Sequence, residues 1–503
     1  MMFPYYLSLL VFSPLIGILV LVFIPKVKEP FIKLIGFLAT LPALILTVIA
    51  YIAHRNGAEL SELAEKVGWM QFVNPEMAGK IYSIDYELGV DGFSLLMLML
   101  TALLSTLAAI ASIHIKKEWK GYFMLFLLLE IGMLGVFAAE NLILFFIFFE
   151  ITLIPTFFLI GKWGYFEKEK AAFKFLVYNG LGSAILLIVI MVLYARTGTS
   201  NIEAIMSIMA SDSDHLVVSA GTKMGLLIAL VVAFGVKLPI FPLHSWMVEV
   251  HVQAPPSIVM LHAGILLKIG AYGLIKFGMG IFPDQFQSLA VWLAVLGVIN
   301  LLYGAFLAFI QTDFKKVLAY SSISHMGVVL IGLGALNAAG IQGAIFQVVS
   351  HGLIAALLFL LVSIVHERYG TSDMAKISGL AKSMPIAAGI LLTAALASLG
   401  IPGMSGFISE FMAFLGLFKE MPVLAAIGCL GIIMTAAYLL RAVLSITFGE
   451  AKRENTEVND VAPLEAIPAA ILVGLIVLIG VYPNILSGSL TSTIETILLG
   501  MGG

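Results

Sequence analysis

Long apolar stretches separated by short polar turns dominate this chain. A helix needs about 20 mostly apolar residues to cross the hydrocarbon core of a bilayer, and stretches of that length predict about fourteen transmembrane helices. The expected spans are 4–25, 33–53, 92–115, 121–138, 141–161, 169–195, 223–246, 254–278, 287–311, 313–336, 341–366, 388–418, 422–447 and 464–487. The first lacks the basic start and the small-residue cleavage site of a signal peptide, so we expect it to stay as a helix.

Positive charge is distributed unevenly among the polar connectors. If connectors alternate between the two sides, one side carries 17 Lys and Arg residues and the other carries 5. Basic residues favour the cytoplasm, so we expect both termini on the outer face and an even number of helices. The long connectors 54–91 and 197–222 then lie outside, and 449–463 lies inside. We interpret all three as solvated links.

Composition supports an all-α polytopic membrane protein embedded in a lipid bilayer. Of 503 residues, 61% are hydrophobic and 11% are charged, and the mean hydropathy is +1.08. A soluble protein of this size needs a more charged surface. The single cysteine, Cys429, excludes a disulfide framework and a cysteine-ligated iron–sulfur cluster within the chain. Nucleotide motifs are absent from the sequence. We therefore expect no cofactor or metal bound by this chain and no nucleic-acid partner.

Charged residues nevertheless lie deep inside several apolar spans. Glu150 stands near the middle of NLILFFIFFEITLIPTFFLIG, and Lys237, Lys268 and Glu410 have similar positions in later spans. An ionisable group at the bilayer centre costs about 2.5–3.5 kcal/mol even on lenient insertion scales. Because each buried charge is this costly, the presence of both acids and bases in the spans indicates that the protein moves charge across a membrane.

A helix break is expected around Lys237. Pro239 and Pro242 have no N–H, so the carbonyls of Gly235 and Leu238 lose their helical partners. Broken helices that carry a charge are typical of ion sites in transporters. The alternative is a simple proline kink in which a salt bridge holds Lys237.

A second break is expected in SLGIPGMSGFISEF, where Gly400, Pro402 and Gly403 precede Glu410. Two interrupted helices roughly 165 residues apart, each with one charge, suggest an internal repeat of five helices. The odd helix number would make the two copies inverted.

This repeat gives the expected domains. They are 1–115 (three helices and an external loop), 116–280 (first repeat), 281–448 (second repeat) and 449–503 (cytoplasmic loop and last helix).

Histidines lie between the two breaks. His325 and His351 occupy consecutive helices between Lys268 and Glu410. Histidine titrates near physiological pH, so these two can relay protons, although a single buried histidine is more often a packing residue. His262, shortly before Lys268, is a secondary candidate.

Glu130 and Glu140 precede Glu150 at ten-residue intervals. Glu130 is a secondary candidate deep in its helix, whereas Glu140 falls in a turn. Because a nearby carboxylate stabilises an ammonium group, a changing separation of Glu150 and Lys237 would change the proton affinity of both. We interpret this pair as a switch.

The sequence resembles the antiporter-like subunits of respiratory complex I, most closely the M-type, also called chain 4. The resemblance covers roughly residues 85–450. The motifs that carry it are GVDGFS (89–94), FFEITLIPTFFLIGKWG (148–164), KLPIFPLHSW (237–246), HVQAPPS (251–257), LLKIGAYGL (266–274), QTDFKKVLAYSSISHMG (311–327) and PGMSGFISEF (402–411). This chain differs from the family in one small respect. The family commonly has an acidic residue just before the histidine of the HVQAP motif, and here the acid is Glu249, with Val250 between it and His251.

By position, the resemblance implies proton-transfer roles for Glu150, Lys237, Lys268, His325, His351 and Glu410. Glu410 favours the M-type, because the L-type and the Na⁺/H⁺ antiporter subunits have lysine at that position. The implied path enters from the cytoplasm near Lys237, runs through Lys268, His325 and His351, and leaves at Glu410.

The resemblance also implies an activity, partners and a location. The chain would be a translocase subunit without a redox centre, driven by quinone reduction, with NADH, flavin, iron–sulfur clusters and quinone in partner subunits. Its partners would be the L-type and N-type antiporter-like subunits and the small membrane subunits, in a bacterial or archaeal inner membrane. Two alternatives stay open: a subunit of a Na⁺/H⁺ antiporter or membrane-bound hydrogenase, and a non-conducting scaffold whose buried charges hold helices together.

Overall fold

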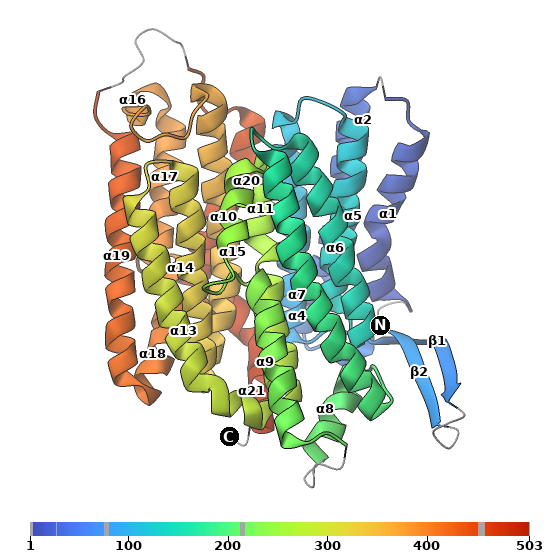
Figure 1. The fold of residues 1–503 in the computed structure, drawn as a ribbon. Coiled ribbons are helices and arrows are strands. Elements are labelled where there is room, and N and C mark those ends of the chain that lie inside the picture. Colours follow the sequence, from blue (N-terminus) through green and yellow to red (C-terminus); the bar gives the residue numbers. More distant parts are fainter. Residues whose placement is uncertain (1–3, 27, 75–79, 212–216, 451–457, 502–503) are drawn as a thin grey trace.

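Long helices packed side by side form most of the molecule (Figure 1). The computed structural model describes residues 4–26, 28–74, 80–211, 217–450 and 458–501. Within these ranges, 13 helical spans are long and apolar enough to cross a membrane. The remaining predicted span, 388–418, is divided between two shorter helices, α17 and α18. The prediction of an all-α polytopic membrane protein with about fourteen crossings is confirmed.

The elements follow the predicted order. The N-terminal part contains α1 (Tyr6–Phe23), α2 (Glu29–Leu38), α3 (Leu41–Arg55), η1 (Leu60–Leu63), β1 (Glu65–Asn74), β2 (Lys80–Leu88), α4 (Gly92–Ala111) and η2 (Ser112–His114). The middle part contains α5 (Trp119–Ala138), α6 (Leu142–Trp163), α7 (Lys168–Thr197), α8 (Ile202–Ser211), α9 (Ala220–Lys237), α10 (Ser245–Gln253), α11 (Pro256–Leu261), η3 (His262–Leu266), α12 (Lys268–Gly273) and η4 (Leu274–Met279). The last part contains α13 (Pro283–Ile310), α14 (Phe314–Gly334), α15 (Ala338–Tyr369), α16 (Leu380–Ser383), α17 (Pro385–Ser398), α18 (Ser405–Glu420), α19 (Pro422–Thr447), α20 (Pro463–Val481) and α21 (Asn484–Gly500).

The connector 54–91, expected as a solvated link, contains an antiparallel hairpin of β1 and β2. Glu65 attaches this hairpin to the start of α1, because its Oε1 accepts from the backbone N–H of Leu7 at 2.6 Å. The connector 197–222 likewise contains a helix, α8, and a further helix, α21, follows the last predicted span. The start of α1, the end of α21, the hairpin and α8 lie toward the same end of the bundle (Figure 1).

The first break separates α9 from α10 within the span predicted as 223–246. The carbonyl of Gly235, expected to lose its helical partner, accepts instead from the N–H of Ile240 at 2.9 Å. The carbonyl of Val236 accepts from the indole N–H of Trp246 at 3.1 Å. Neighbouring protein groups therefore satisfy these carbonyls, as a backbone at membrane depth requires. Lys237 is the last residue of α9.

Asn300 of α13 supports the backbone inside this break. Its Oδ1 accepts from the N–H of Phe241 at 2.7 Å, and its Nδ2 donates to the carbonyl of Pro239 at 3.3 Å. The same Nδ2 lies 3.1 Å from the carbonyl of Ile323 in α14. One fully buried amide thus connects the broken helix to two neighbours.

The second break separates α17 from α18 and is built on glycines. Gly400 and Gly403 adopt φ values of +69° and +91°, which a residue with a side chain adopts only with strain. A Cβ at Gly400 would lie 2.8 Å from Oε2 of Glu410. The turn at Gly400 therefore brings the backbone close to the carboxylate of Glu410.

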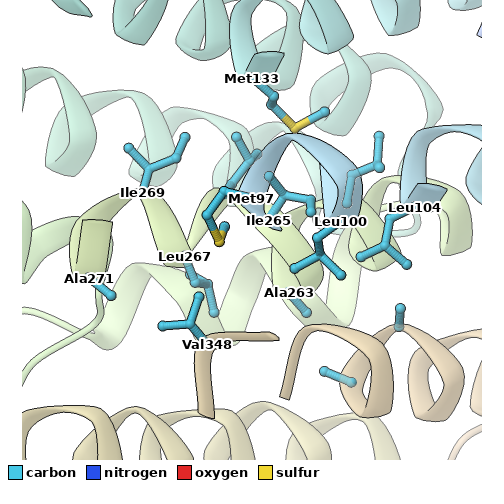
Figure 2. Close-up of a cluster of buried hydrophobic side chains, with 14 of the residues drawn as sticks. Met97, Leu100, Leu104, Met133, Ala263, Ile265, Leu267, Ile269, Ala271 and Val348 are labelled. Atoms are coloured by element: carbon cyan, nitrogen blue, oxygen red, sulfur yellow. The ribbon is translucent and has the colours of Figure 1, made fainter. Parts of the chain in front are cut away.

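The segment from α11 to η4 runs through the centre of the bundle and is buried except at Lys276, which is partly buried. Figure 2 shows its residues Ile265 and Leu267 in one cluster of buried side chains with Met97 and Leu100 of α4 and Val348 of α15. Both η3 and η4 are π-helical, a widened geometry that is frequent at functional sites. Lys268 begins the short α-helix between them.

Corresponding caps relate the two halves of the chain. Asn141 caps the N-terminus of α6 and forms an isolated bridge with Asn201, which follows α7. Asp313 caps α14 and forms the same bridge with Asp373, which follows α15. Each member of the second pair lies 172 positions after its counterpart. This correspondence supports two related repeats. Their inverted relationship and the four-part domain division stay predictions.

Candidate functional site

Buried ionisable side chains form a row through the middle of the bundle. Lys237, Lys268, His325, His351 and Glu410 are each at most 8% exposed. They belong to five different helical segments: α9, α12, α14, α15 and α18. Residues far apart in the sequence are therefore gathered inside the molecule, where the cost of burying each charge must be offset by a task or a partner.

Lys237 has no hydrogen-bond partner among the described residues, and its side chain is 2% exposed. Its Nζ lies 4.7 Å from the centroid of the Phe149 ring and 5.8 Å from that of Phe175. Aromatic faces attract a cation weakly compared with a carboxylate. The alternative of a proline kink stabilised by a salt bridge at Lys237 does not fit this environment.

Glu150 follows Phe149 on α6, but no ion pair joins it to Lys237 in the part of the chain that the structure describes. Its Oε1 is buried without a hydrogen-bond partner. The carboxylate of Glu150 and the ammonium of Lys237 are therefore not in contact. The expected switch between Glu150 and Lys237 stays a prediction.

Lys268 contacts His351 directly. Nζ of Lys268 lies 2.7 Å from Nδ1 of His351, and it also donates to the carbonyl of Ala263. Two nitrogens at this distance hold one proton between them. The contact joins the central helix to α15 and provides a direct route for that proton.

His325 and Glu410 form the next contact in the row. Nδ1 of His325 lies 3.3 Å from Oε1 of Glu410 and 3.3 Å from Nε2 of Gln347. The amide donates to a deprotonated Nδ1, whereas the carboxylate accepts from a protonated one. Nε2 of His325 lies 3.1 Å from the hydroxyl of Ser398. The surroundings of His325 therefore accommodate both of its protonation states.

A small cavity of about 10 Å³ lies between these groups. Its lining includes His325, Gln347, His351 and Glu410. The volume is near the lower limit for one water molecule, and the lining supplies the polar partners that a buried water needs. The imidazole rings of His325 and His351 have centroids 5.4 Å apart, so one water can bridge the step between them.

The contacts give an order that differs from the expected path. Lys268 meets His351, and His325 meets Glu410, so His351 precedes His325. Gln347 and Ser398 were not predicted as site residues, because they are ordinary polar residues within apolar helices and carry no separate sequence signal.

A pair of buried histidines lies beside the row. Nε2 of His251 lies 2.9 Å from Nδ1 of His262. His262 was a secondary candidate, whereas His251 was noted only as part of the HVQAP motif. The two residues are eleven positions apart across the Pro255–Pro256 turn, and only the angle between α10 and α11 brings them together.

Glu130, the other secondary candidate, lies on α5 outside these contacts. It is fully buried, and neither carboxylate oxygen has a hydrogen-bond partner among the described residues. Burial raises the cost of the ionised form. The structure does not bring Glu130 into direct contact with the row.

Acid–base groups at these distances can pass protons from one to the next. In the described residues, no group of three or more His, Cys, Asp or Glu side chains is arranged to hold a metal ion. The row instead alternates donors and acceptors with both protonation states accommodated at His325 and at the Lys268–His351 contact. Stepwise proton transfer is the chemistry that this geometry supports.

Comparison with known proteins places the chain in a family. Residues 139–435 match the family described as NADH:quinone oxidoreductase/Mrp antiporter, transmembrane. NADH-quinone oxidoreductase subunit M of Rhodobacter capsulatus is 36% identical over 487 residues, which cover 96% of this chain and 94% of the relative. NAD(P)H-quinone oxidoreductase chain 4 2 of Thermosynechococcus vestitus is 37% identical over 96% of this chain and 90% of the relative.

The fold agrees with these relatives. A chain in the structure of respiratory complex I from Thermus thermophilus with bound NADH matches with a TM-score of 0.85 and 29% identity, covering 99% of this chain and all of that one. The chain therefore belongs to the NADH:quinone oxidoreductase/Mrp antiporter transmembrane family, and within it to the M-type (chain 4) antiporter-like subunits.

Proposed function

We propose that this chain is a proton-translocating membrane subunit of an NADH–quinone oxidoreductase. The observation that carries the proposal is the row of contacts from Lys268 through His351 and His325 to Glu410. The relatives named as subunit M and chain 4 support this assignment over a Na⁺/H⁺ antiporter or hydrogenase subunit.

Redox energy reaches this subunit from its partners. NADH, flavin, iron–sulfur clusters and quinone are held by other subunits, and L-type and N-type antiporter-like subunits and small membrane subunits flank this chain. A conformational change at the contact with a partner subunit moves Glu150 relative to Lys237. The ammonium of Lys237 then gains or loses the nearby carboxylate that stabilises its charge. Proton release from Lys237 toward Lys268 follows when Glu150 is distant.

The path runs from the cytoplasm to the outer face. It enters near Lys237, passes Lys268, His351 and His325, and leaves at Glu410. The chain lies in a bacterial or archaeal inner membrane with both termini outside, as the 17-to-5 distribution of basic residues favours.

The scaffold alternative fits poorly with Lys237 and Glu130. Buried charges that hold helices together are paired, because pairing offsets their desolvation. The ammonium of Lys237 and both oxygens of Glu130 have no hydrogen-bond partner in the described residues. Burying these groups therefore costs desolvation free energy, and no hydrogen bond or ion pair to another helix among the described residues offsets it.

The test compares proton pumping with electron transfer in membrane vesicles that contain the whole complex. Lys237→Ala and Glu410→Gln should assemble yet lose most of their pumping, whereas the exposed control Lys419→Ala should keep it. Full pumping in both core variants would overturn the proposal. A tagged chain should co-purify with quinone-site and iron–sulfur subunits. Purification with antiporter subunits alone would make Na⁺/H⁺ exchange the function.

A further inference from the structure

His251 and His262 form a closed pair inside the protein. They are 1% and 0% exposed, and the hydrogen bond between them joins Nε2 of one to Nδ1 of the other. Aromatic rings surround the pair: Trp246 and Phe175 pack on His262 with centroid distances of 5.3 and 6.0 Å, and Phe359 packs on His251 at 4.9 Å. This apolar wall leaves the inner hydrogen bond well protected.

The two outer nitrogens of the pair have no partner. Neither Nδ1 of His251 nor Nε2 of His262 makes a hydrogen bond with the described residues, although both atoms are buried. A pair kept only for packing would be more stable with these polar atoms satisfied or replaced by carbon. The inner nitrogens share a hydrogen bond, and each outer nitrogen is free to accept or donate a proton, which is the arrangement that proton transfer through two rings requires.

The chemistry of imidazole lets the pair take up one proton, become briefly cationic, and return to neutrality when another proton leaves. Each neutral ring carries one N–H, so a single proton lies on the inner bond and one of the two outer nitrogens carries the other. A proton that binds the bare outer nitrogen drives the inner proton across 2.9 Å to the other ring. The far outer N–H then breaks and releases its proton. One N–H bond forms at entry and one breaks at exit, and both rings end neutral with their tautomers exchanged.

The pair is connected to the surroundings of both buried lysines. Phe175 packs on His262 and also lies beneath the ammonium of Lys237, 5.8 Å from Nζ. His262 begins η3, the π-helical segment that leads directly to Lys268.

We propose that the His251–His262 pair relays a proton between Lys237 and Lys268 by exchanging tautomers. The proposal rests on the proposed function, because it assigns the proton transfer from Lys237 to Lys268, two residues that are not in direct contact. After one passage the tautomers are exchanged, so the rings must reset before the next proton passes. The pair therefore passes one proton per cycle.

The test uses His251→Gln, His262→Gln and the double variant in vesicles that contain the whole complex. Glutamine keeps a donor and an acceptor but cannot exchange tautomers. Each single variant should lose as much pumping per electron transferred as Lys237→Ala, and the double variant should lose no more than either single one, because residues that act as a unit are not additive. The control His366→Gln, which also removes a histidine with an unpaired Nδ1, should pump normally.

Several outcomes would overturn the relay. Full pumping in either assembled single variant would do so, and so would single losses that add in the double variant. If Lys237→Ala and Glu410→Gln also pump fully, the proposed function fails. If those two variants are blocked and the glutamine variants are not, only the relay fails. Should His262→Gln not assemble, His251→Gln on α10 tests the same wire, and its solvent isotope effect on pumping must exceed that of the unaltered protein.

Discussion

The Lys268 ammonium and the His351 imidazole share a buried hydrogen bond of 2.7 Å. Lys268 is fully buried on the central helix and His351 is 5% exposed on α15. The contact can transfer a proton only because the ammonium of lysine can lose one. A side chain that keeps its proton would preserve the positive charge but would block proton transfer to His351.

Lys268→Arg should therefore abolish pumping while it preserves positive charge. Arginine is not deprotonated in proteins, so it donates to His351 permanently. We expect at least a tenfold fall in pumping, about 1.4 kcal/mol or more in the limiting barrier, measured as vesicle acidification per quinone reduced. Lys316→Arg, at an exposed lysine of α14, is the matched control and should pump normally. Normal pumping by the Lys268 variant would show that this lysine need not release a proton.

The helices and their buried charges could be predicted from the sequence because both leave local signals. A run of apolar residues of sufficient length predicts a crossing, and a charge such as Glu150 or Glu410 within it stands out against that background. The residues carried over from the complex I resemblance, including Lys268 and His351, are those whose type alone indicates proton chemistry.

What the sequence could not provide depends on angles between helices. The pairing of His251 with His262 follows from the turn between α10 and α11, which no periodicity specifies. The role of Asn300 depends on packing against a break about sixty positions earlier. The hairpin of β1 and β2 was missed because its strands mix polar with apolar residues and a bulge between Gly68 and Met70 shifts the register, so the alternation is weak.

Asn300→Leu should destabilise the protein at the first break. The change removes the acceptor for Phe241 and the donor for Pro239 and Ile323, and each unsatisfied buried backbone group costs about 1–3 kcal/mol. The expected result is a lower thermal unfolding temperature of the purified complex together with reduced pumping. Asn179→Leu is a matched control, since this buried amide donates only to a carbonyl of its own helix. Equal destabilisation by both variants would contradict the special role of Asn300.

Asp91→Asn should make the stability less dependent on pH. Burial opposes ionisation of Asp91, but Lys276 at 2.9 Å and the N–H of Ser94 at 2.7 Å hold the pKa of this carboxyl below its ordinary value. A group with a lowered pKa stabilises the fold above its unfolded pKa, and this contribution is lost as pH falls below about 4. The unfolding temperature of the variant should therefore be lower than that of the unaltered protein at pH 7, and this difference should shrink toward pH 3.

The control for this pH series is Asp284→Asn, in the exposed first turn of α13. It should unfold like the unaltered protein throughout. A gap that stays constant across the series would mean that ionisation of Asp91 does not stabilise the fold, because asparagine keeps the oxygen that caps α4.

Gly400→Ala should impair pumping beyond its effect on stability. At φ +69° a side chain costs about 1–2 kcal/mol, and the added Cβ would also meet Oε2 of Glu410 at 2.8 Å. The carboxylate must then move away from His325, which weakens the last contact of the row. Gly370→Ala provides the matched comparison, because Gly370 has φ +70° with no atom within 4 Å of an added Cβ. Both variants should lower the unfolding temperature by a similar amount, whereas only Gly400→Ala should lower pumping per electron transferred. Equal pumping in the two variants would show that the position of Glu410 relative to His325 does not limit transport.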